Sequence, residues 1–437
     1  MDSLFHVGGV YRPAHVNMYV YRCGSSACYD REEVKVGTRS VVARIFLAGV
    51  SVIVTLWVLI AGIYEPAWAE AQKQALVPSI PITAESALIM ECTSGRILFE
   101  KNPDKRLPPA SITKIMTMLL VMEQVSLGKV RFSDMVVTSE RAMRMGGSQI
   151  WLEVGEEMSL EDLMKAIAIV SANDASVAVA EHIAGSEEAF VDMMNKRGQE
   201  LGMTGTNFVN ASGLPHPDHY STAKDIALMS RALLRYPKVH EWFTTWIDYV
   251  RDGKNILVNT NRLIKSYEGV DGLKTGFTEE AGYCLAATAE KGSLRLVSVV
   301  LKVPDSTTRF NEASALLNLG FRHFAGVELA KEGQVIAEVE VTRGVVDKVD
   351  IICKDRLVGV VPRGEEDKVR HEIALPRKVD APVAKGQKIG EMLAVTEDGS
   401  NLGRIDLIAS EEVKRGNILR VIFRTTQNLL RALFKNN

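Results

Sequence analysis

Ser111 and Lys114 stand three residues apart in "PPASITKIMT", directly after two prolines and at the start of an apolar run. A serine in a first helical turn lies near the positive end of the helix dipole, and a lysine three residues later projects from the same face. Such a lysine acts as a base only when it is neutral, so burial or a nearby cation must lower its pKa. The spacing therefore predicts a serine nucleophile, a lysine base and a second positive group beside them.

Serine–lysine pairs of this spacing are not specific on their own, because the chain contains three of them. The other two are Ser126–Lys129 and Ser221–Lys224. Lys129 follows Gly128, where the helix after Ser111 is expected to end, and Ser221 or Thr222 fits the N-cap of the next helical pattern. Ser111 could equally be the N-cap of its own helix. The pair alone leaves a structural and a catalytic reading open.

Two further motifs follow in order along the chain. "SAND" places Ser171 and Asn173 after the apolar pattern "LMKAIAIV", and "DGLKTGFTEEAGYCLAA" places Lys274, Thr275 and Gly276 before a strand pattern. Each is the one occurrence of its motif, SxN or KTG, in the chain. Taken separately, Ser171 could be only a helix cap, Asn173 only a turn residue, and KTG only part of a loop. Three motifs in one order, separated by regular elements, favour a single catalytic site.

The patterns around these motifs predict an α+β domain over residues 78–325. Alternating apolar residues on either side of a Thr-Ser-Gly turn in "SALIMECTSGRILFEKN" predict a hairpin. Helical periodicity predicts helices over residues 111–128, 159–173, 187–202, 221–234 and 309–324. Two apolar runs around Lys291-Gly292 predict a second strand pair. Strands, then helices, then strands indicate a mostly antiparallel sheet covered by helices.

Beyond this domain the composition changes to short β-branched runs separated by Gly, Pro and Asp. This pattern predicts a separate small all-β domain over residues 326–411. The segment contains no cluster of potential catalytic groups.

Residues 38–70 are typical of a secretory signal peptide, because a basic front precedes the apolar stretch 41–64 and the small-x-small pattern "AWA" follows it. The charge-free residues 45–64 are also long enough to span a bilayer, so an uncleaved signal anchor is the alternative. Residues 1–37 do not fit such a peptide, and we interpret them as a misassigned start or a disordered extension. Either interpretation of the apolar stretch exports everything that follows it.

Residues 412–437 have the pattern of an amphipathic helix. Polar and basic side chains share one helical face, at Arg420, Arg424, Gln427, Arg431 and Lys435. Apolar residues occupy the other faces, and a basic polar face is typical of a helix lying in a membrane interface. A helix docked on its own protein is the alternative.

Charge and cysteine content exclude other classes of function. The 52 basic residues nearly balance the 54 acidic ones, so the chain has no basic excess that would favour nucleic acid as a partner. The five cysteines form no CxxC pair, and no histidine cluster has metal-ligand spacing. We therefore expect neither a metal site nor a cofactor.

The three motifs and the segments around them resemble a known family. The segments are "LPPASITKIMTMLL", "GGSQIWLEVGEEMSLEDLMKAIAIVSANDASVAVAEH", "NFVNASGLPHPDHYSTAKDIALMSRALL" and "VDGLKTGFTEEAGYCLAATA". They are similar to the penicillin-recognising acyl-serine enzymes, and closely to the low-molecular-mass penicillin-binding proteins that are D-alanyl-D-alanine carboxypeptidases. The resemblance covers residues 80–325. It implies a β-lactamase/transpeptidase-like α+β domain, an antiparallel sheet flanked by helices, followed by a small all-β domain.

The resemblance also implies roles for the first two motifs. Ser111 would attack the carbonyl of the penultimate D-alanine, with Lys114 as general base. Ser171 would relay a proton toward the leaving amine, and Asn173 would hold the lysine and the substrate amide. The backbone N–H groups of Ser111 and Phe277 would form the oxyanion hole.

For the third motif, the resemblance implies that Lys274 and Thr275 bind the terminal carboxylate, and that Lys274 also helps to keep the catalytic lysine neutral. Gly276 would leave room for the substrate backbone along its strand. Arg309 resembles a family arginine near the carboxylate pocket, although a surface cap residue explains it as well. Phe277 stands where some relatives carry histidine, which leaves a side-chain effect on substrate preference open.

The implied activity is removal of the terminal D-alanine from peptidoglycan pentapeptides through an acyl-enzyme. A DD-endopeptidase that cleaves cross-links is the nearest alternative, because the motifs do not distinguish the two substrates. A class A β-lactamase would carry a glutamate in an ExxLN pattern, where this chain reads "TGTNFVNASGLP". A non-catalytic wall-binding scaffold would need a broken motif, and none is broken.

The same resemblance implies partners and a location. β-Lactams would act as inhibitors rather than as substrates, because the deacylating glutamate is missing. The C-terminal helix would hold the enzyme on a membrane surface. We expect an exported, peripheral protein at the outer face of the bacterial cytoplasmic membrane, in the periplasm or cell-wall space.

Overall fold

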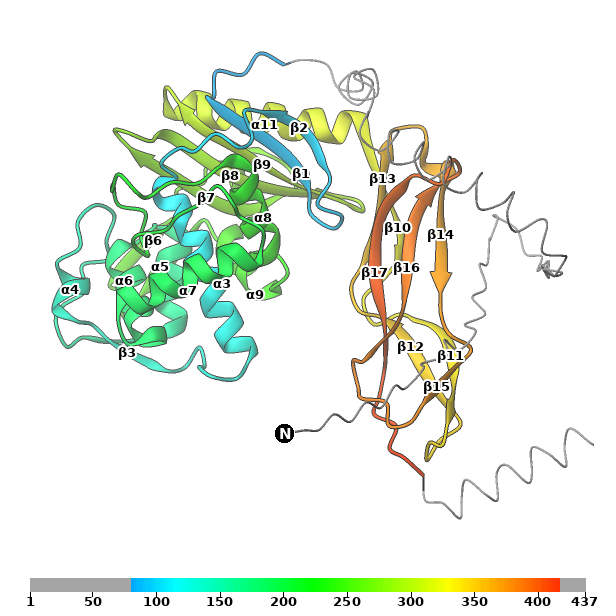
Figure 1. The fold of residues 1–437 in the computed structure, drawn as a ribbon. Coiled ribbons are helices and arrows are strands. Elements are labelled where there is room, and N and C mark those ends of the chain that lie inside the picture. The colour runs from blue at the N-terminus through cyan, green and yellow to red at the C-terminus, as the bar shows by residue number, and fades with distance from the viewer. Residues whose placement is uncertain (1–79, 417–437) are drawn as a thin grey trace, which may run out of the picture. The chain divides into compact units, whose positions relative to one another are not determined.

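The computed structural model describes residues 80–416, which divide into two compact units (Figure 1). Within this range the α+β unit comprises residues 80–326 and 360–364, and the β unit comprises residues 327–359 and 365–416. The predicted N-terminal extension, the signal peptide and the helix pattern from residue 417 onward lie outside the described residues.

The α+β unit is built on a five-stranded sheet with the strand order β2-β1-β9-β8-β7. All neighbouring strands in it are antiparallel. The strands are β1 (Ser86–Glu91), β2 (Ile97–Lys101), β7 (Val270–Thr278), β8 (Gly282–Lys291) and β9 (Leu294–Val303). The strand β7, which contains the KTG motif, therefore lies at an edge of the sheet, and one side of its backbone is not paired within the sheet.

Helices cover both faces of this sheet. The long helix α11 (Ser306–His323) packs on one face, where Ser298 of β9 donates a hydrogen bond to the carbonyl of Ala313 (Figure 1). The other face packs against the main helical cluster, and Leu88 and Val299 belong to that shared apolar core. This arrangement confirms the predicted α+β fold with an antiparallel sheet between helices.

The helical cluster contains four of the five helices predicted from periodicity, the fifth being α11, together with shorter elements. The predicted helix over residues 159–173 ends earlier, at Ile169, and a separate helix that was not predicted begins at Asn173. Its helices are α3 (Lys114–Ser126), α4 (Glu140–Met143), α5 (Leu160–Ile169), α6 (Asn173–Ala184), α7 (Glu187–Glu200), α8 (Ala223–Leu233), α9 (Pro237–Thr244) and α10 (Leu263–Ser266). Two small hairpins accompany them, formed by β3 (Met135–Val137) with β4 (Glu157–Ser159) and by β5 (Ile247–Val250) with β6 (Asn255–Val258).

Local capping explains where the predicted helices begin. The Ser159 hydroxyl accepts from the N–H of Asp162 at the start of α5, and the Thr222 hydroxyl accepts from the N–H of Asp225 at the start of α8. Both caps confirm the sequence interpretation, and for α8 the cap is Thr222 rather than Ser221.

The β unit is centred on a six-stranded sheet with the order β14-β16-β17-β12-β11-β15 (Figure 1). Its strands are β11 (Val335–Thr342), β12 (Lys348–Cys353), β14 (Val369–Ala374), β15 (Lys378–Asp380), β16 (Lys388–Thr396) and β17 (Asn401–Ala409). A separate pair consists of β10 (Phe324–Ala330) and β13 (Leu357–Pro362). This all-β architecture is the one that the β-branched pattern predicted.

The end of the described chain still belongs to this unit. Val413 pairs with Val383 and Arg415 pairs with Gly344 as isolated β-bridges. Residues 412–416 are therefore not helical. No helix among residues 80–416 is long and apolar enough to cross a membrane.

Candidate active site

Ser111 lies in a 3₁₀ turn, Ala110–Thr113, that leads directly into α3. The expected first turn of an α-helix is thus a tighter turn with three residues per repeat, in which side chains at i and i+3 eclipse. This geometry places Lys114 directly above Ser111, and Lys114 Nζ lies 3.0 Å from Ser111 Oγ. The N-cap positions of the turn and of α3 are Pro109 and Thr113, and neither start has a side-chain capping bond, so the N-cap interpretation of Ser111 is wrong.

The turn has a strained residue that neighbouring segments hold in place. Ala110 has a positive φ of 48°, which is uncommon for a residue with a Cβ. A Cβ at Gly213 would lie 1.9 Å from the Ala110 carbonyl oxygen, and one at Gly276 would lie 2.9 Å from the Pro109 carbonyl oxygen. The backbone of the KTG strand and the backbone around Gly213 therefore contact the turn from two sides, which only glycine allows.

Lys114 is fully buried, and its amine has three polar neighbours. Besides Ser111 Oγ, Nζ donates to Asn173 Oδ1 at 2.6 Å and to the Ser212 carbonyl oxygen at 2.5 Å. Burial lowers the pKa of Lys114 well below its usual value, the positive charge of Lys274 lowers it further, and Asp174 opposes the shift. A neutral amine can donate to the two carbonyl-type oxygens and keep its lone pair for the Ser111 proton.

The SAN motif crosses from the end of α5 to the start of α6. Asn173 is the first residue of α6, and its Nδ2 donates to the Gly146 carbonyl at 2.6 Å, which orients Oδ1 toward Lys114. Ser171 has a positive φ of 69° and a buried side chain. Its Oγ has no hydrogen-bond partner among residues 80–416. A buried hydroxyl without a partner can bond a ligand at little cost.

The KTG motif contributes two side chains from β7. Lys274 is fully buried, and its Nζ has no hydrogen-bond partner within the described part of the chain. Burial, together with the nearby charge of Arg309, lowers the pKa of Lys274 to about 7. Thr275 is also buried, and its hydroxyl donates to Thr260 Oγ1 at 2.8 Å.

Arg309 reaches this strand from α11. Its Nη1 donates to the Gly276 carbonyl at 3.1 Å, and its side chain is buried. The surface-cap reading is therefore wrong, and the cap of α11 is Asp305. Burial lowers the pKa of Arg309 to about 10. No ion pair joins Arg309 or Lys274 to a carboxylate in the described range, so two buried cations lie near each other without a counter-charge.

Phe277, which follows the motif, is half exposed. Its ring contacts the ring of Tyr283 on β8, with the ring centroids 4.4 Å apart. The side chain of Phe277 therefore packs against β8.

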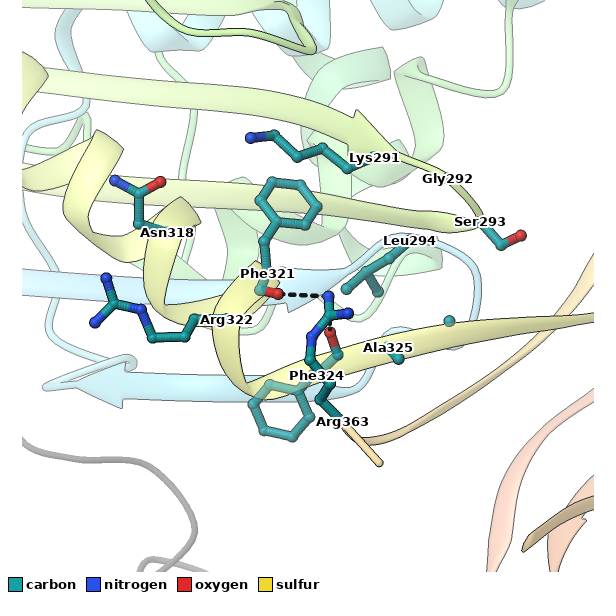
Figure 2. A pocket seen from close by; sticks show the side chains of 11 residues that line it. Lys291, Gly292, Ser293, Leu294, Asn318, Phe321, Arg322, Phe324, Ala325 and Arg363 are labelled. Atoms are coloured by element: carbon teal, nitrogen blue, oxygen red, sulfur yellow. Dashed lines mark hydrogen bonds between the residues drawn. The ribbon is translucent and has the colours of Figure 1, made fainter. Parts of the chain in front are cut away.

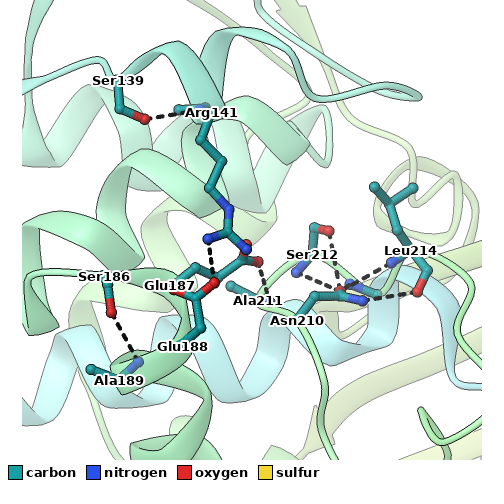
Figure 3. Close-up of polar contacts among 12 residues, drawn as sticks. Ser139, Arg141, Ser186, Glu187, Glu188, Ala189, Asn210, Ala211, Ser212 and Leu214 are labelled. Carbon is teal, nitrogen blue, oxygen red and sulfur yellow. Dashed lines mark hydrogen bonds and ion pairs between the residues drawn. The ribbon is translucent and has the colours of Figure 1, made fainter.

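The loop around Ser212, to which the sequence interpretation gave no role, places its carbonyl 2.5 Å from Lys114 Nζ. Figure 3 shows the side chains that order this loop. Asn210 organises this loop, because its Oδ1 accepts from the N–H groups of Ser212, Gly213 and Leu214. Its Nδ2 donates to the Leu214 carbonyl at 3.0 Å. An asparagine shortly before a glycine in "NASGLP" is a turn signal that could have indicated this ring of bonds.

The buried carboxylate of Glu187 also holds this loop in place (Figure 3). Glu187 Oε1 accepts from the N–H of Ala211 at 3.0 Å, and Glu187 Oε2 pairs with Arg141 at 2.7 Å. On the next turn of α3, Thr117 donates to the Ala211 carbonyl at 2.7 Å. Nothing in the local sequence pattern marks Glu187, because its partners lie far away in the chain.

A cavity of about 470 Å³ lies elsewhere in the α+β unit (Figure 2). The turn between β8 and β9 and the end of α11 line it, with Lys291, Phe321 and Arg363 among its side chains. Residues 284–286 of β8 pair with the KTG motif, whereas Lys291 ends the same strand. The cavity is therefore separate from Ser111. No group of three or more His, Cys, Asp or Glu side chains within residues 80–416 could hold a metal ion.

Comparison with known proteins identifies the family. The model of the peptidase S11 family, D-alanyl-D-alanine carboxypeptidase, matches residues 70–305, more than half of the chain. This chain belongs to the D-alanyl-D-alanine carboxypeptidase family. Residues 324–415 match the C-terminal domain of penicillin-binding protein 5, so the β unit is also typical of the family. The family resemblance inferred from the three motifs is confirmed.

Named relatives cover most of the chain. The D-alanyl-D-alanine carboxypeptidase DacF of Bacillus subtilis is 44% identical over 346 residues, 78% of this chain and 89% of DacF. The crystal structure of penicillin binding protein 5 from Haemophilus influenzae superposes with a TM-score of 0.63 and 34% identity, and covers 78% of this chain and all of that one.

Two other relatives cover just over half of this chain. Penicillin-binding protein D2 from Listeria monocytogenes, in its ampicillin-bound form, has a TM-score of 0.52 and 34% identity, over 56% of this chain and 99% of that chain. A D-alanyl-D-alanine endopeptidase of Pseudomonas aeruginosa is 32% identical over 54% of this chain and 76% of its own length.

Proposed function

We propose that this chain is a serine-type D-alanyl-D-alanine carboxypeptidase that removes the terminal D-alanine from peptidoglycan stem pentapeptides through an acyl-enzyme on Ser111. The observation that carries the proposal is the buried amine of Lys114, 3.0 Å from the Ser111 hydroxyl and held by Asn173 and the Ser212 carbonyl. Membership of the carboxypeptidase family supports it independently.

Acylation begins with proton transfer from Ser111 Oγ to the neutral amine of Lys114, while Oγ attacks the carbonyl carbon of the penultimate D-alanine. Backbone N–H groups of Ser111 and Phe277 stabilise the oxyanion of the tetrahedral intermediate. Ser171 relays the proton that Lys114 has accepted to the nitrogen of the terminal D-alanine as the C–N bond breaks, which leaves Lys114 neutral again. Water then hydrolyses the ester and restores the free Ser111 hydroxyl.

The two buried cations bind the carboxylate of the terminal D-alanine. Lys274 and Arg309 lack a counter-charge among the described residues, and a carboxylate between them would supply it. The Thr275 hydroxyl adds a neutral donor. This contact accounts for recognition of a free chain terminus. The positive charge of Lys274 also helps to keep Lys114 neutral.

The β unit supports the carboxypeptidase over the endopeptidase, because DacF shares nearly its full length with this chain and the endopeptidase matches about half of it. The test uses the purified protein and its Ser111→Ala variant with a pentapeptide ending in D-Ala-D-Ala and with a cross-linked peptide dimer. We expect release of free D-alanine from the pentapeptide by the wild type alone. Cleavage of the dimer in preference to the pentapeptide would establish the endopeptidase instead.

β-Lactams are inhibitors in this proposal, since a relative that is 34% identical over 56% of this chain has been solved in an ampicillin-bound form. They acylate Ser111, and the resulting acyl-enzyme is hydrolysed slowly. Labelled penicillin should bind covalently to the wild type and not to Ser111→Ala. Label that persists in this variant would place the nucleophile elsewhere.

The location follows from segments outside the described residues. We propose export through residues 38–70 and peripheral attachment to the outer face of the membrane through the basic amphipathic segment 417–437. Deleting residues 417–437 keeps the bridges of Val413 and Arg415 and should release the protein from membranes. Retention of the shortened, signal-cleaved protein would refute the anchor.

A further inference from the structure

His219 is a buried histidine outside the three motifs. It follows the loop that carries Ser212, and its ring makes two hydrogen bonds to other segments. The backbone N–H of Val209 donates to Nδ1 at 3.1 Å, and Nε2 lies 2.8 Å from Thr113 Oγ1. A backbone N–H can only donate, so Nδ1 carries no proton. In the neutral ring the proton is then on Nε2, which donates to the Thr113 hydroxyl.

The environment keeps this ring uncharged. Burial, with smaller contributions from the protonated forms of His216 and Lys114, lowers the pKa of His219 to about 4. The edge of the Phe208 ring packs against it, with centroids 5.9 Å apart. The imidazole is therefore a rigid, neutral bridge with one fixed tautomer, and it does not titrate near neutral pH.

The two bonds of His219 join the two segments that position Lys114. Thr113 ends the 3₁₀ turn that places Lys114 above Ser111. Val209 begins the loop whose Ser212 carbonyl accepts from the same amine. The ring therefore sets the spacing between the turn and the loop, and the Lys114 amine lies between them.

We propose that His219 is a positioning residue for acylation, which holds the 3₁₀ turn against the Val209–Ser212 loop so that Lys114 Nζ stays within proton-transfer distance of Ser111 Oγ. This inference rests on the proposed function, because it assigns Lys114 as the base. His219 itself touches neither Ser111 nor Lys114 through a hydrogen bond, so it acts through Thr113 and Val209.

The decisive bond is the one to Thr113, and two isosteric substitutions separate it from the bond to Val209. In His219→Gln the side-chain amide nitrogen occupies the place of Nε2 and can donate to Thr113. In His219→Asn the side-chain oxygen occupies the place of Nδ1 and can accept from Val209 only. A residue that merely fills space would tolerate both substitutions alike.

The experiment measures acylation by a chromogenic β-lactam in rapid mixing, which separates the acylation rate constant from the dissociation constant of the non-covalent complex. Displacement of a catalytic group by about 1 Å costs roughly 100-fold in rate, so we expect His219→Ala and His219→Asn to lower the acylation rate constant by about 10- to 100-fold. The dissociation constant should change less than about 2-fold, because the carboxylate site is untouched. His219→Gln should recover most of the rate.

Two controls keep the result specific. His216→Asn changes a half-exposed histidine of the same loop and should leave the rate unchanged. Thr113→Val removes the hydroxyl that accepts from His219. Adding His219→Ala to this variant should lower the acylation rate constant little further, because both substitutions remove the same hydrogen bond. Thermal unfolding of every variant excludes loss of folded protein as the cause, and if His219→Ala does not fold, the Gln and Asn variants decide.

The outcomes separate this inference from the proposed function. A wild type that takes up no β-lactam refutes the proposed function and this inference with it. A reactive wild type with equal rate constants in His219→Gln and His219→Asn overturns the positioning role alone. Additive losses in the Thr113→Val background overturn it as well.

Discussion

Two serine–lysine pairs of identical spacing lie in opposite environments in this molecule. Lys114 is fully buried, and its amine lies 3.0 Å from Ser111 Oγ. The side chain of Lys224 is 45% exposed and pairs with Asp104 at 3.5 Å. Ser221 is buried, and its hydroxyl bonds to Thr206 instead of to the lysine. Residue types and spacing are shared, so the surroundings alone separate a reactive pair from a structural one.

Backbone conformation explains the difference between the pairs. Ser111 lies inside the 3₁₀ turn, so the side chains at i and i+3 eclipse. Ser221 lies before Thr222, the N-cap of α8, whose φ of −123° and ψ of 159° are extended. An extended residue between them turns Ser221 away from Lys224, and the backbone of Ser221 pairs with Leu107.

The largest difference should appear when both lysines are changed to methionine, which keeps the length and removes the amine. Lys114→Met should lower the rate of penicillin acylation by about 100- to 10,000-fold, the usual contribution of a general base. Lys224→Met should change it by less than about 2-fold, since it loses only a surface ion pair. Stopped-flow acylation checks both, and similar losses in the two variants would break the comparison.

Lys274 sharpens the comparison, because it is a second buried lysine that has no hydrogen-bond partner among the described residues. Lys274→Met should weaken β-lactam binding about 10- to 100-fold by removing a charge-assisted bond to the carboxylate. It should also stabilise the free protein at pH 7 by about 2–4 kcal/mol, since a cation is no longer buried. Binding kinetics and thermal unfolding measure the two effects, and a less stable variant would contradict the second.

The pH dependence of the same group has a definite sign. The folded pKa of Lys274, about 7, lies below the ordinary lysine pKa of 10.5, so the unfolded chain binds more protons between these values. Stability of the wild type should therefore rise with pH across this window, and this slope should flatten in Lys274→Met. Denaturant unfolding at pH 7 and pH 9 tests it, and an equal slope in both proteins would refute the assignment.

Activity should respond in the opposite direction, because in the proposed function the substrate carboxylate binds to the charged form of Lys274. Acylation efficiency of the wild type should fall as the pH rises above about 7. This fall is the alkaline limb of the pH profile. The charge of Arg309 adds to the effect of burial in lowering the pKa of Lys274, so Arg309→Met should move the limb to higher pH. Arg322→Met, on the exposed last turn of α11, is the matched control and should leave the limb in place. A limb that moves equally in both variants would contradict a specific effect of Arg309.

Features set by short-range contacts could be predicted from the sequence. The hairpin of β1 and β2 and the caps at Ser159 and Thr222 involve residues that are close along the chain. The three motifs were found because each is a short run with a fixed spacing. Their meeting at one site was implied by their order and by the family resemblance, rather than by periodicity.

Features set by distant contacts could not be predicted in this way. The Ser212 carbonyl is 98 residues from Lys114, and Glu187 acts on the loop from another helix. Burial of Arg309 depends on how α11 packs on β8 and β9, which no local pattern specifies. The return of residues 360–364 to the α+β unit is of the same kind. Packing between separate elements decides all of these.

The smallest predicted effect concerns the serine of the structural pair. Ser221→Ala removes the hydrogen bond to Thr206 Oγ1, but Thr206 keeps its bond to Asp225 at 2.7 Å. One buried hydrogen bond between side chains contributes about 1 kcal/mol, so we expect a loss of stability of that size. The acylation rate should stay within about 2-fold of the wild type, because Ser221 lies outside the network of Lys114. A loss of acylation without a loss of stability would show that the second pair also reaches the active site, since its backbone pairs with Leu107 only four residues before Ser111.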